Sequence, residues 1–209
     1  MTARWQQRVL LVVLLALLTA IGVTLLTGRG SAVSPPAQLS NSPFAGPAMP
    51  PNLRAAGFSL TDQNGRRVTL AQYRGKVVVL TFIHSLCHDA CPLMVEAIKG
   101  ALDDLPASGR GIPAVGITVA PAEDSVARRR WFLRTHRMTG RLSFLSGPAF
   151  ELRRVWRAYA VQPVTPKVDH STFVILIDKR GVERIGFPAD QLRPEDLAHD
   201  IRLLERQRA

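Results

Sequence analysis

The sequence predicts an α/β domain in which a mixed β-sheet is flanked by helices. Three apolar, β-branched runs, at residues 76–83, 112–119 and 172–178, have the length and composition of buried strands. Stretches with apolar residues at helical spacing lie between and after them. Two short alternating runs also surround Asn64-Gly65, a strong hairpin signal. Because helical crossovers join parallel strands and hairpins add antiparallel ones, we expect a mixed sheet covered by helices.

Each element follows in chain order from its own pattern. Asn64-Gly65 supplies the turn of the opening hairpin, and Leu93, Ile98 and Leu102 repeat at helical spacing after the first buried strand. The expected elements are a hairpin at 58–70, a strand at 76–83, a helix at 92–105, a strand at 112–119, helices at 123–137 and 150–160, a strand at 172–178 with a hairpin partner at 182–187, and a helix at 194–208.

The N-terminal segment predicts a membrane anchor. Residues 9–26 form an 18-residue run without charge or proline, about the shortest length that spans a bilayer as a helix. Arg4 and Arg8 precede it, so the positive-inside rule leaves the N-terminus in the cytoplasm and exports the remainder. A cleaved signal peptide is the alternative, although its apolar region is normally only about 7 to 15 residues long. We therefore expect residues 1–30 to be a cytoplasmic stub and a transmembrane helix.

The anchor is expected in a bacterial inner membrane, with the soluble domain on the periplasmic side. A mitochondrial inner membrane is the alternative, but no long Arg- and Ser-rich transit segment precedes the apolar run. Residues 31–51 contain six prolines and no charge, which favours an extended linker. The folded domain is then expected at residues 52–209.

The chain is basic, with a formal net charge of +11 at pH 7. Such an excess suits nucleic acid, anionic lipid or an acidic protein partner, and export argues against nucleic acid. Much of the excess lies on the two helical stretches at 123–137 and 150–160, where we interpret the arginines as solvated helix faces.

The two cysteines of the chain, Cys87 and Cys91, lie together in the loop between a buried strand and a helix. Loops at this place carry the sites of many α/β sheets. Asp89 is a candidate N-cap, which would put Cys91 at a helix N-terminus, where the dipole favours a thiolate. The pair could form a disulfide, although so short a loop would stabilise the fold little. In reduced form it could hold a metal.

Two thiolates under-coordinate most metals, so a third ligand is sought among the histidines. His170 lies just before the strand at 172–178, in a segment that need not be buried. His84 and His88 lie in the cysteine loop and could add a ligand, but an exposed loop histidine is more often solvated. His136 and His199 lie in charged helical stretches and are expected at the surface.

Two sequence segments together resemble one known family. The stretch TFIHSLCHDACPLM looks like the CxxxCP signature of the Sco/SenC copper proteins, and VDHSTFVILID looks like their DHS motif. The resemblance covers essentially all of residues 52–208. It implies a thioredoxin-like fold in which Cys87, Cys91 and His170 bind one copper ion, with Asp169 in support. It also implies delivery of copper to the dinuclear copper site of cytochrome c oxidase, whose copper-accepting subunit would be the partner.

The chain departs from the family pattern at three places. His88 stands where the family usually has proline after the first cysteine. The stretch TVAP at 118–121 lacks the aspartate of the family's VDP, and Ser125-Val126 replaces the usual TP. These departures remove no ligand, but they bear on the partner and on the metal cycle.

The favoured function is a copper metallochaperone, which is not an enzyme, and it could also meet another copper donor or a thiol reductant. The alternative is a thiol-disulfide oxidoreductase that uses Cys87 and Cys91 as its redox pair to reduce the oxidase's copper-binding cysteines. That alternative does not need His170. A peroxiredoxin is less expected, because His84 and His88 occupy the places where such enzymes have Thr or Ser. A copper or redox sensor remains a third class, but we find no output domain.

Overall fold

The computed structural model describes residues 42–106, 111–164 and 173–208. The chain divides into two compact units, residues 1–41 and 42–209. The expected transmembrane helix and the first part of the expected linker therefore lie outside the described residues, as does His170. Within the described ranges no helix is long and apolar enough to cross a bilayer.

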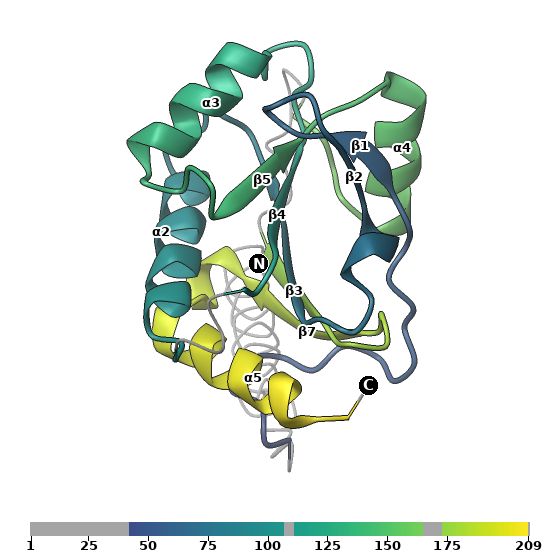
Figure 1. Cartoon of the computed structure of the whole chain (residues 1–209), viewed down its shortest axis with the longest axis vertical. Coiled ribbons are helices and arrows are strands. Elements are labelled where there is room, and N and C mark those ends of the chain that lie inside the picture. The colour runs from purple at the N-terminus through teal and green to yellow at the C-terminus, as the bar shows by residue number, and fades with distance from the viewer. Residues whose placement is uncertain (1–41, 107–110, 165–172, 209) are drawn as a thin grey trace, which may run out of the picture. The chain divides into compact units, whose positions relative to one another are not determined.

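The folded unit is built on a mixed five-stranded sheet with the order β5-β4-β3-β6-β7. The three strands β3, β4 and β5 are parallel, as Figure 1 shows. Strand β6 pairs antiparallel with β3, and β7 pairs antiparallel with β6. The strands are β3 (Val78–Ile83), β4 (Ala114–Thr118), β5 (Leu142–Leu145), β6 (Phe173–Ile177) and β7 (Glu183–Pro188). The mixed sheet predicted from the sequence is thus confirmed.

Helices cover both faces of this sheet, and its central strand is therefore buried on both sides. Along β3, Val79 and Ile83 belong to one apolar cluster, whereas Leu80 and Phe82 belong to another, since successive strand side chains alternate. The first cluster packs under α2 (Ala90–Asp103), α3 (Val126–Thr135) and α5 (Pro194–Arg206). The second packs under α4 (Ala149–Ala158) and the first two strands.

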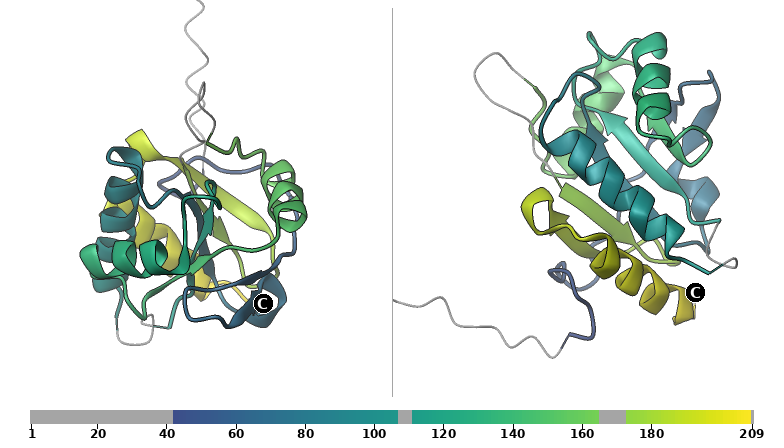
Figure 2. Two further views of the ribbon diagram at one scale, coloured as in Figure 1. Left: turned by 90° about the horizontal axis from the view of Figure 1, so that it is seen from above. Right: turned by 90° about the vertical axis from the view of Figure 1, so that its left-hand side faces the viewer.

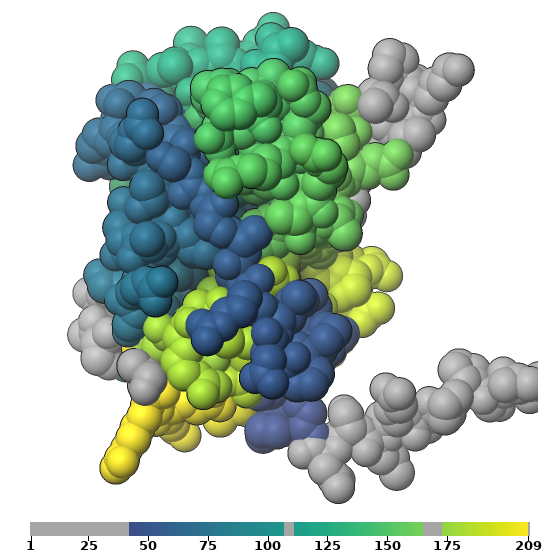
Figure 3. Space-filling view, turned by 90° about the vertical axis from the view of Figure 1, so that its right-hand side faces the viewer, coloured from purple at the N-terminus to yellow at the C-terminus, as the bar shows by residue number. Residues whose placement is uncertain are grey.

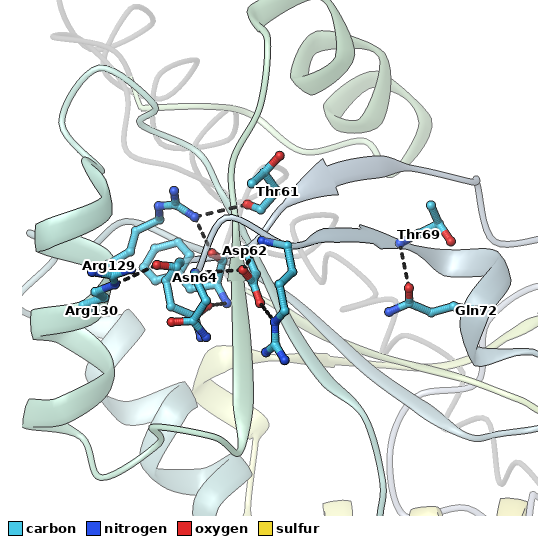
Figure 4. A network of polar contacts seen from close by, with 10 residues as sticks. Thr61, Asp62, Asn64, Thr69, Gln72, Arg129 and Arg130 are labelled. Carbon is cyan, nitrogen blue, oxygen red and sulfur yellow. Dashed lines mark hydrogen bonds and ion pairs between the residues drawn. The ribbon is translucent and has the colours of Figure 1, made fainter.

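The first two strands, β1 (Ser59–Thr61) and β2 (Arg67–Thr69), form the predicted antiparallel hairpin as a separate two-stranded sheet. Gly65 has φ of 81°, which explains a glycine in the turn. The carboxylate of Asp62 accepts the backbone N–H groups of Asn64 at 2.7 Å and Arg66 at 2.9 Å, as Figure 4 shows. These bonds close the turn around one buried acid.

Strand β5 is the element that the sequence interpretation missed. It spans only Leu142–Leu145, and so short a run gives no clear alternation. Its pairing with β4, in which Gly116 faces Phe144, makes it a strand. Tertiary context therefore defines this edge of the sheet.

The compact unit starts at Ser42, ten residues before the expected domain boundary at residue 52. The backbone N–H of Ala45 donates to the carboxylate of Asp200 at 2.8 Å, and that of Met49 donates to the Arg184 carbonyl at 2.9 Å. This part of the proline-rich segment therefore lies along β7, whose outer edge would otherwise stay unpaired. Among the described residues, both apolar clusters belong to the unit 42–209, which is therefore expected to fold alone.

Candidate functional site

The cysteine loop lies at the edge of the sheet where the parallel strands end. Strand β3 stops at Ile83 and α2 starts at Ala90, so Cys87 lies in the loop and Cys91 in the first turn of the helix. The N–H of Cys87 donates to the His84 carbonyl at 3.1 Å and closes a turn. This edge is at the top of Figure 1 and faces the viewer in the left panel of Figure 2.

The two cysteine sulfurs face each other within this loop. The backbone N–H of Cys91 donates to Sγ of Cys87 at 3.4 Å, and that of His84 donates to Sγ of Cys91 at 3.5 Å. Cys91 is fully buried, Cys87 is half-buried, and no disulfide joins them in this structure. Of the two sulfurs, that of Cys87 therefore lies closer to solvent.

The pKa of Cys91 is raised far above its usual range. The main cause is its hydrogen bond with Cys87, followed by burial and by repulsion from charge on Cys87 and Asp124. The thiolate that the sequence predicted at Cys91 is therefore not favoured, because the hydrogen bond with Cys87 and burial raise the pKa of its thiol. In the first turn of the helix, the N–H of Cys91 donates to Sγ of Cys87.

Asp89 does not cap the helix as expected. It occupies the N-cap position, but its side chain accepts no capping hydrogen bond and its backbone has φ of −110° and ψ of −93°. The sulfur of Cys87 accepts the N–H that such a cap would take. The helix start is thus tied directly to the cysteine pair.

The buried carboxylate of Asp124 holds the cysteine loop in place through hydrogen bonds to Ser85. It accepts the Ser85 N–H at 2.9 Å, the Ser85 hydroxyl, and the Thr118 hydroxyl at 2.5 Å. Asp124 is only 2% exposed. It therefore connects the loop after β3 to the loop after β4. The sequence interpretation missed this residue, although both segments follow neighbouring parallel strands, which is the signal that could have identified it.

A buried arginine extends this support to the first hairpin. Arg129 is 4% exposed, and its guanidinium donates to the carbonyls of Asp124 at 3.2 Å, Thr61 at 3.2 Å and Phe144 at 2.5 Å. Figure 4 shows it pointing toward Thr61. Burial lowers its pKa from the usual value. The interpretation of this helix face as solvated is thus wrong for Arg129.

The loop histidines differ in their surroundings. Nε2 of His84 lies 3.1 Å from Oε2 of Glu123, and only 12% of the His84 side chain is exposed. His88 is exposed. His136 lies against the Phe132 ring and is half-buried rather than at the surface. Among the described residues, no group of three or more potential ligands is arranged to hold a metal.

The described residues on both sides of the segment that carries His170 lie at the cysteine edge. The Val164 N–H donates to the Val119 carbonyl at 3.2 Å, just after β4 ends. Phe173 starts β6, and its ring packs 5.6 Å from that of Phe82, near the end of β3. His170 itself is outside the described residues.

Comparison with known proteins gives a family match over most of the chain. The SCO1/SenC family model matches residues 48–205. The protein sco1 of Schizosaccharomyces pombe is 30% identical over 157 residues, which cover 69% of this chain and 58% of that protein. A putative peroxiredoxin of Mycobacterium tuberculosis is 30% identical over 131 residues, covering 60% of this chain and 77% of that protein. The chain spans about half the length of the first curated relatives that it matches.

Solved structures share the fold. The structure of Bradyrhizobium japonicum ScoI with copper bound matches with a TM-score of 0.58 at 27% identity, over 72% of this chain and 99% of that one. Crystalline Arabidopsis thaliana ScoI with copper bound matches with a TM-score of 0.62 at 26% identity, over 73% of this chain and 98% of that one. The thioredoxin-like fold expected from the sequence is confirmed.

Proposed function

This chain belongs to the SCO1/SenC family, and we propose that it is a copper metallochaperone that binds one copper ion through Cys87, Cys91 and His170. The observation that carries the proposal is that the sulfurs of Cys87 and Cys91 lie together at the edge of the sheet where the parallel strands end. Copper-bound ScoI proteins among the structural relatives support the choice of metal.

The donor set suits cuprous copper. Thiolates prefer soft Cu(I), and imidazole accepts either oxidation state. The side chains of Cys87 and Cys91 share a hydrogen bond, and each thiol would release its proton on binding copper through its sulfur. Asp124 would keep the loop in place while that exchange occurs, because it holds Ser85 from both backbone and side chain.

The third ligand is proposed from chain connectivity. His170 precedes Phe173 by three residues, which span at most about 11 Å. Phe173 lies beside Phe82, at the end of the strand that leads into the cysteine loop. Both observations support a histidine within reach of the sulfurs. With three ligands the site would leave a coordination position through which a partner could take the metal.

Residues 9–26 are proposed as a transmembrane anchor that holds the domain on the periplasmic side of a bacterial inner membrane. The support is the uncharged 18-residue run with arginines before it. The proposed acceptor is the copper-accepting subunit of cytochrome c oxidase, with another copper donor or a thiol reductant as a further partner.

Copper stoichiometry of residues 42–209 tests this proposal. The reduced protein is loaded with Cu(I) without oxygen, and the parent is compared with His170→Ala. We expect one copper per parent chain and at least about tenfold weaker binding in the variant, in line with the loss of one ligand. His88→Ala is the matched control and should bind like the parent. Equal affinities for the parent and His170→Ala would refute the three-ligand site.

A thiol-disulfide oxidoreductase is the second candidate, favoured by the half-buried Cys87 with the buried Cys91 beneath it. The Cys87 thiolate would attack a disulfide of the partner, forming a mixed disulfide and releasing one partner thiolate. Cys91 would then lose its proton and attack Sγ of Cys87, releasing the second partner thiol. Two electrons pass to the partner, and a thiol reductant must restore the pair. Exchange that is unaffected by His170→Ala, in a chain that binds no copper, would favour this function.

A further inference from the structure

A cavity of about 210 Å³ lies at the end of the sheet opposite the cysteine loop. Its wall includes Val78, the first residue of β3, and Ile177, the last residue of β6. Leu70 and Tyr73 contribute from the short helix η1 (Leu70–Tyr73). The pocket thus has an apolar floor, and Figure 3 shows this face of the molecule, where the segment before β1 lies near the β6–β7 turn.

The rim of this pocket is strongly cationic. Its charged lining residues are one acid, Asp178, and five cations, namely Arg54, Arg74, Lys76, Lys179 and Arg180. The acid is already engaged, because its carboxylate accepts the N–H groups of Arg180 and Val182 at 2.9 Å each. It also pairs with the guanidinium of Arg184 at 3.1 Å. One carboxylate therefore cannot neutralise the rim.

Three of the five cations lack an acidic partner. The guanidinium of Arg54 donates only to the neutral carbonyl of Arg180, at 3.1 Å. Arg74 and Lys76 are exposed, and their side chains make no hydrogen bond or ion pair with any residue that the structure describes. By contrast, Lys179 pairs with the Glu205 carboxylate at 3.9 Å. Uncompensated positive charge therefore lines a pocket whose wall is also apolar.

We propose that this pocket binds the phosphate group of an anionic phospholipid. Guanidinium groups match phosphate oxygens in a bidentate geometry, and an ammonium adds a mobile point charge. The apolar floor suits the glycerol and acyl carbons that lie beside a lipid phosphate. A free inorganic anion would use the rim and leave the floor unused.

The position of the pocket along the chain supports a lipid as the source of the phosphate. The apolar run ends at residue 26 and the folded unit starts at Ser42, so 15 residues separate them. Fifteen residues extend at most about 50 Å, which keeps the domain close to the bilayer if the segment is an anchor. This step rests on the proposed anchor, whereas the pocket itself does not.

Lipid binding at this pocket would orient the domain relative to the membrane. Strand β3 runs from Val78 beside the pocket to Ile83 beside the cysteine loop, about 17 Å along the strand. A bilayer held at the pocket would therefore leave the cysteine edge facing away from the membrane. The copper site would then remain accessible to a partner that projects from the same surface.

Vesicle co-sedimentation of residues 42–209 tests the pocket without the proposed anchor. The parent is compared on phosphatidylcholine vesicles with and without phosphatidylglycerol. The pocket variant carries Arg74→Ser and Lys76→Ser. The control carries Arg134→Ser and Arg153→Ser, which remove the same charge from exposed positions on α3 and α4. Thermal unfolding confirms that both variants fold.

We expect phosphatidylglycerol to promote binding of the parent, and the pocket variant to bind at least about tenfold more weakly, since each basic residue near an anionic surface contributes about fivefold. The control should lose less than about threefold. If both variants lose the same amount of vesicle binding, overall positive charge explains the binding, and the proposal that the pocket binds phosphate is overturned. In a second experiment, calorimetry measures binding of soluble glycerol phosphate. A protein that binds glycerol phosphate but not vesicles would overturn the proposal that the bound phosphate belongs to a lipid. Failure of copper loading would leave either result unaffected.

Discussion

Replacing Asp124 with asparagine should loosen the cysteine loop. Oδ1 of Asp124 accepts both donors of Ser85, and Oδ2 accepts the Thr118 hydroxyl at 2.5 Å. An amide nitrogen would replace one of these acceptors, so at least one donor would lose its partner inside the fold. Losing a buried hydrogen bond to a charged group costs about 1.5 to 3 kcal/mol.

We therefore expect Asp124→Asn to reduce the free energy of unfolding by about 2 to 4 kcal/mol. Ser85→Ala loses only the hydroxyl bond and should cost about 1 to 2 kcal/mol. Because the two residues share that bond, the double variant should cost about 1 kcal/mol less than the sum. Urea unfolding of residues 42–209 measures all three values. Asp190→Asn, at an exposed position, is the control and should stay within about 0.5 kcal/mol of the parent.

Copper affinity should decrease in the same order as stability. A loosened Ser85 no longer fixes the loop that holds Cys87, so copper affinity should fall in Asp124→Asn and less in Ser85→Ala. Strictly additive stability effects, or an Asp124→Asn variant as stable as the parent, would refute the role assigned to this carboxylate.

Three other predictions concern buried groups and the N-terminal segment. Burial raises the pKa of Glu183 to about 7 from 4.5, so the stability associated with its neutral form is lost as pH rises through 7. Glu183→Gln should therefore gain on the parent by as much as about 3 kcal/mol between pH 5 and pH 8 in urea unfolding, and a gap that is the same at both pH values would contradict this. Iodoacetamide should alkylate Cys87 before Cys91, because Cys91 is fully buried and its pKa is raised; peptide mass spectrometry that finds Cys91 modified first would reverse the assignment. Asp200→Ala should cost about 2 to 4 kcal/mol and speed proteolysis near residue 45, because its carboxylate holds two backbone N–H groups of that segment; unchanged cleavage would show that the segment is held by packing alone.

The sequence already indicated the elements that depend on local pattern. The buried run Val78–Ile83 is apolar except for Thr81, and the hairpin turn needs a glycine at positive φ, so both are visible in the residues themselves. The spacing of Cys87 and Cys91 after such a strand also placed the candidate site. These features require no long-range contact to be recognised.

The tertiary structure decided the features that depend on residues far apart in the chain. Strand β5 forms because its backbone pairs with β4. The segment after Ser42 belongs to the folded unit because it is hydrogen-bonded to Asp200 and lies along β7. The chemistry of the cysteine pair was decided in the same way, because the hydrogen bond with Cys87 and burial raise the pKa of Cys91. Asp124 acts from 39 positions away from Ser85. Local pattern predicts where a chain bends and which residues it buries, but hydrogen bonds and desolvation inside the core depend on which distant segments meet.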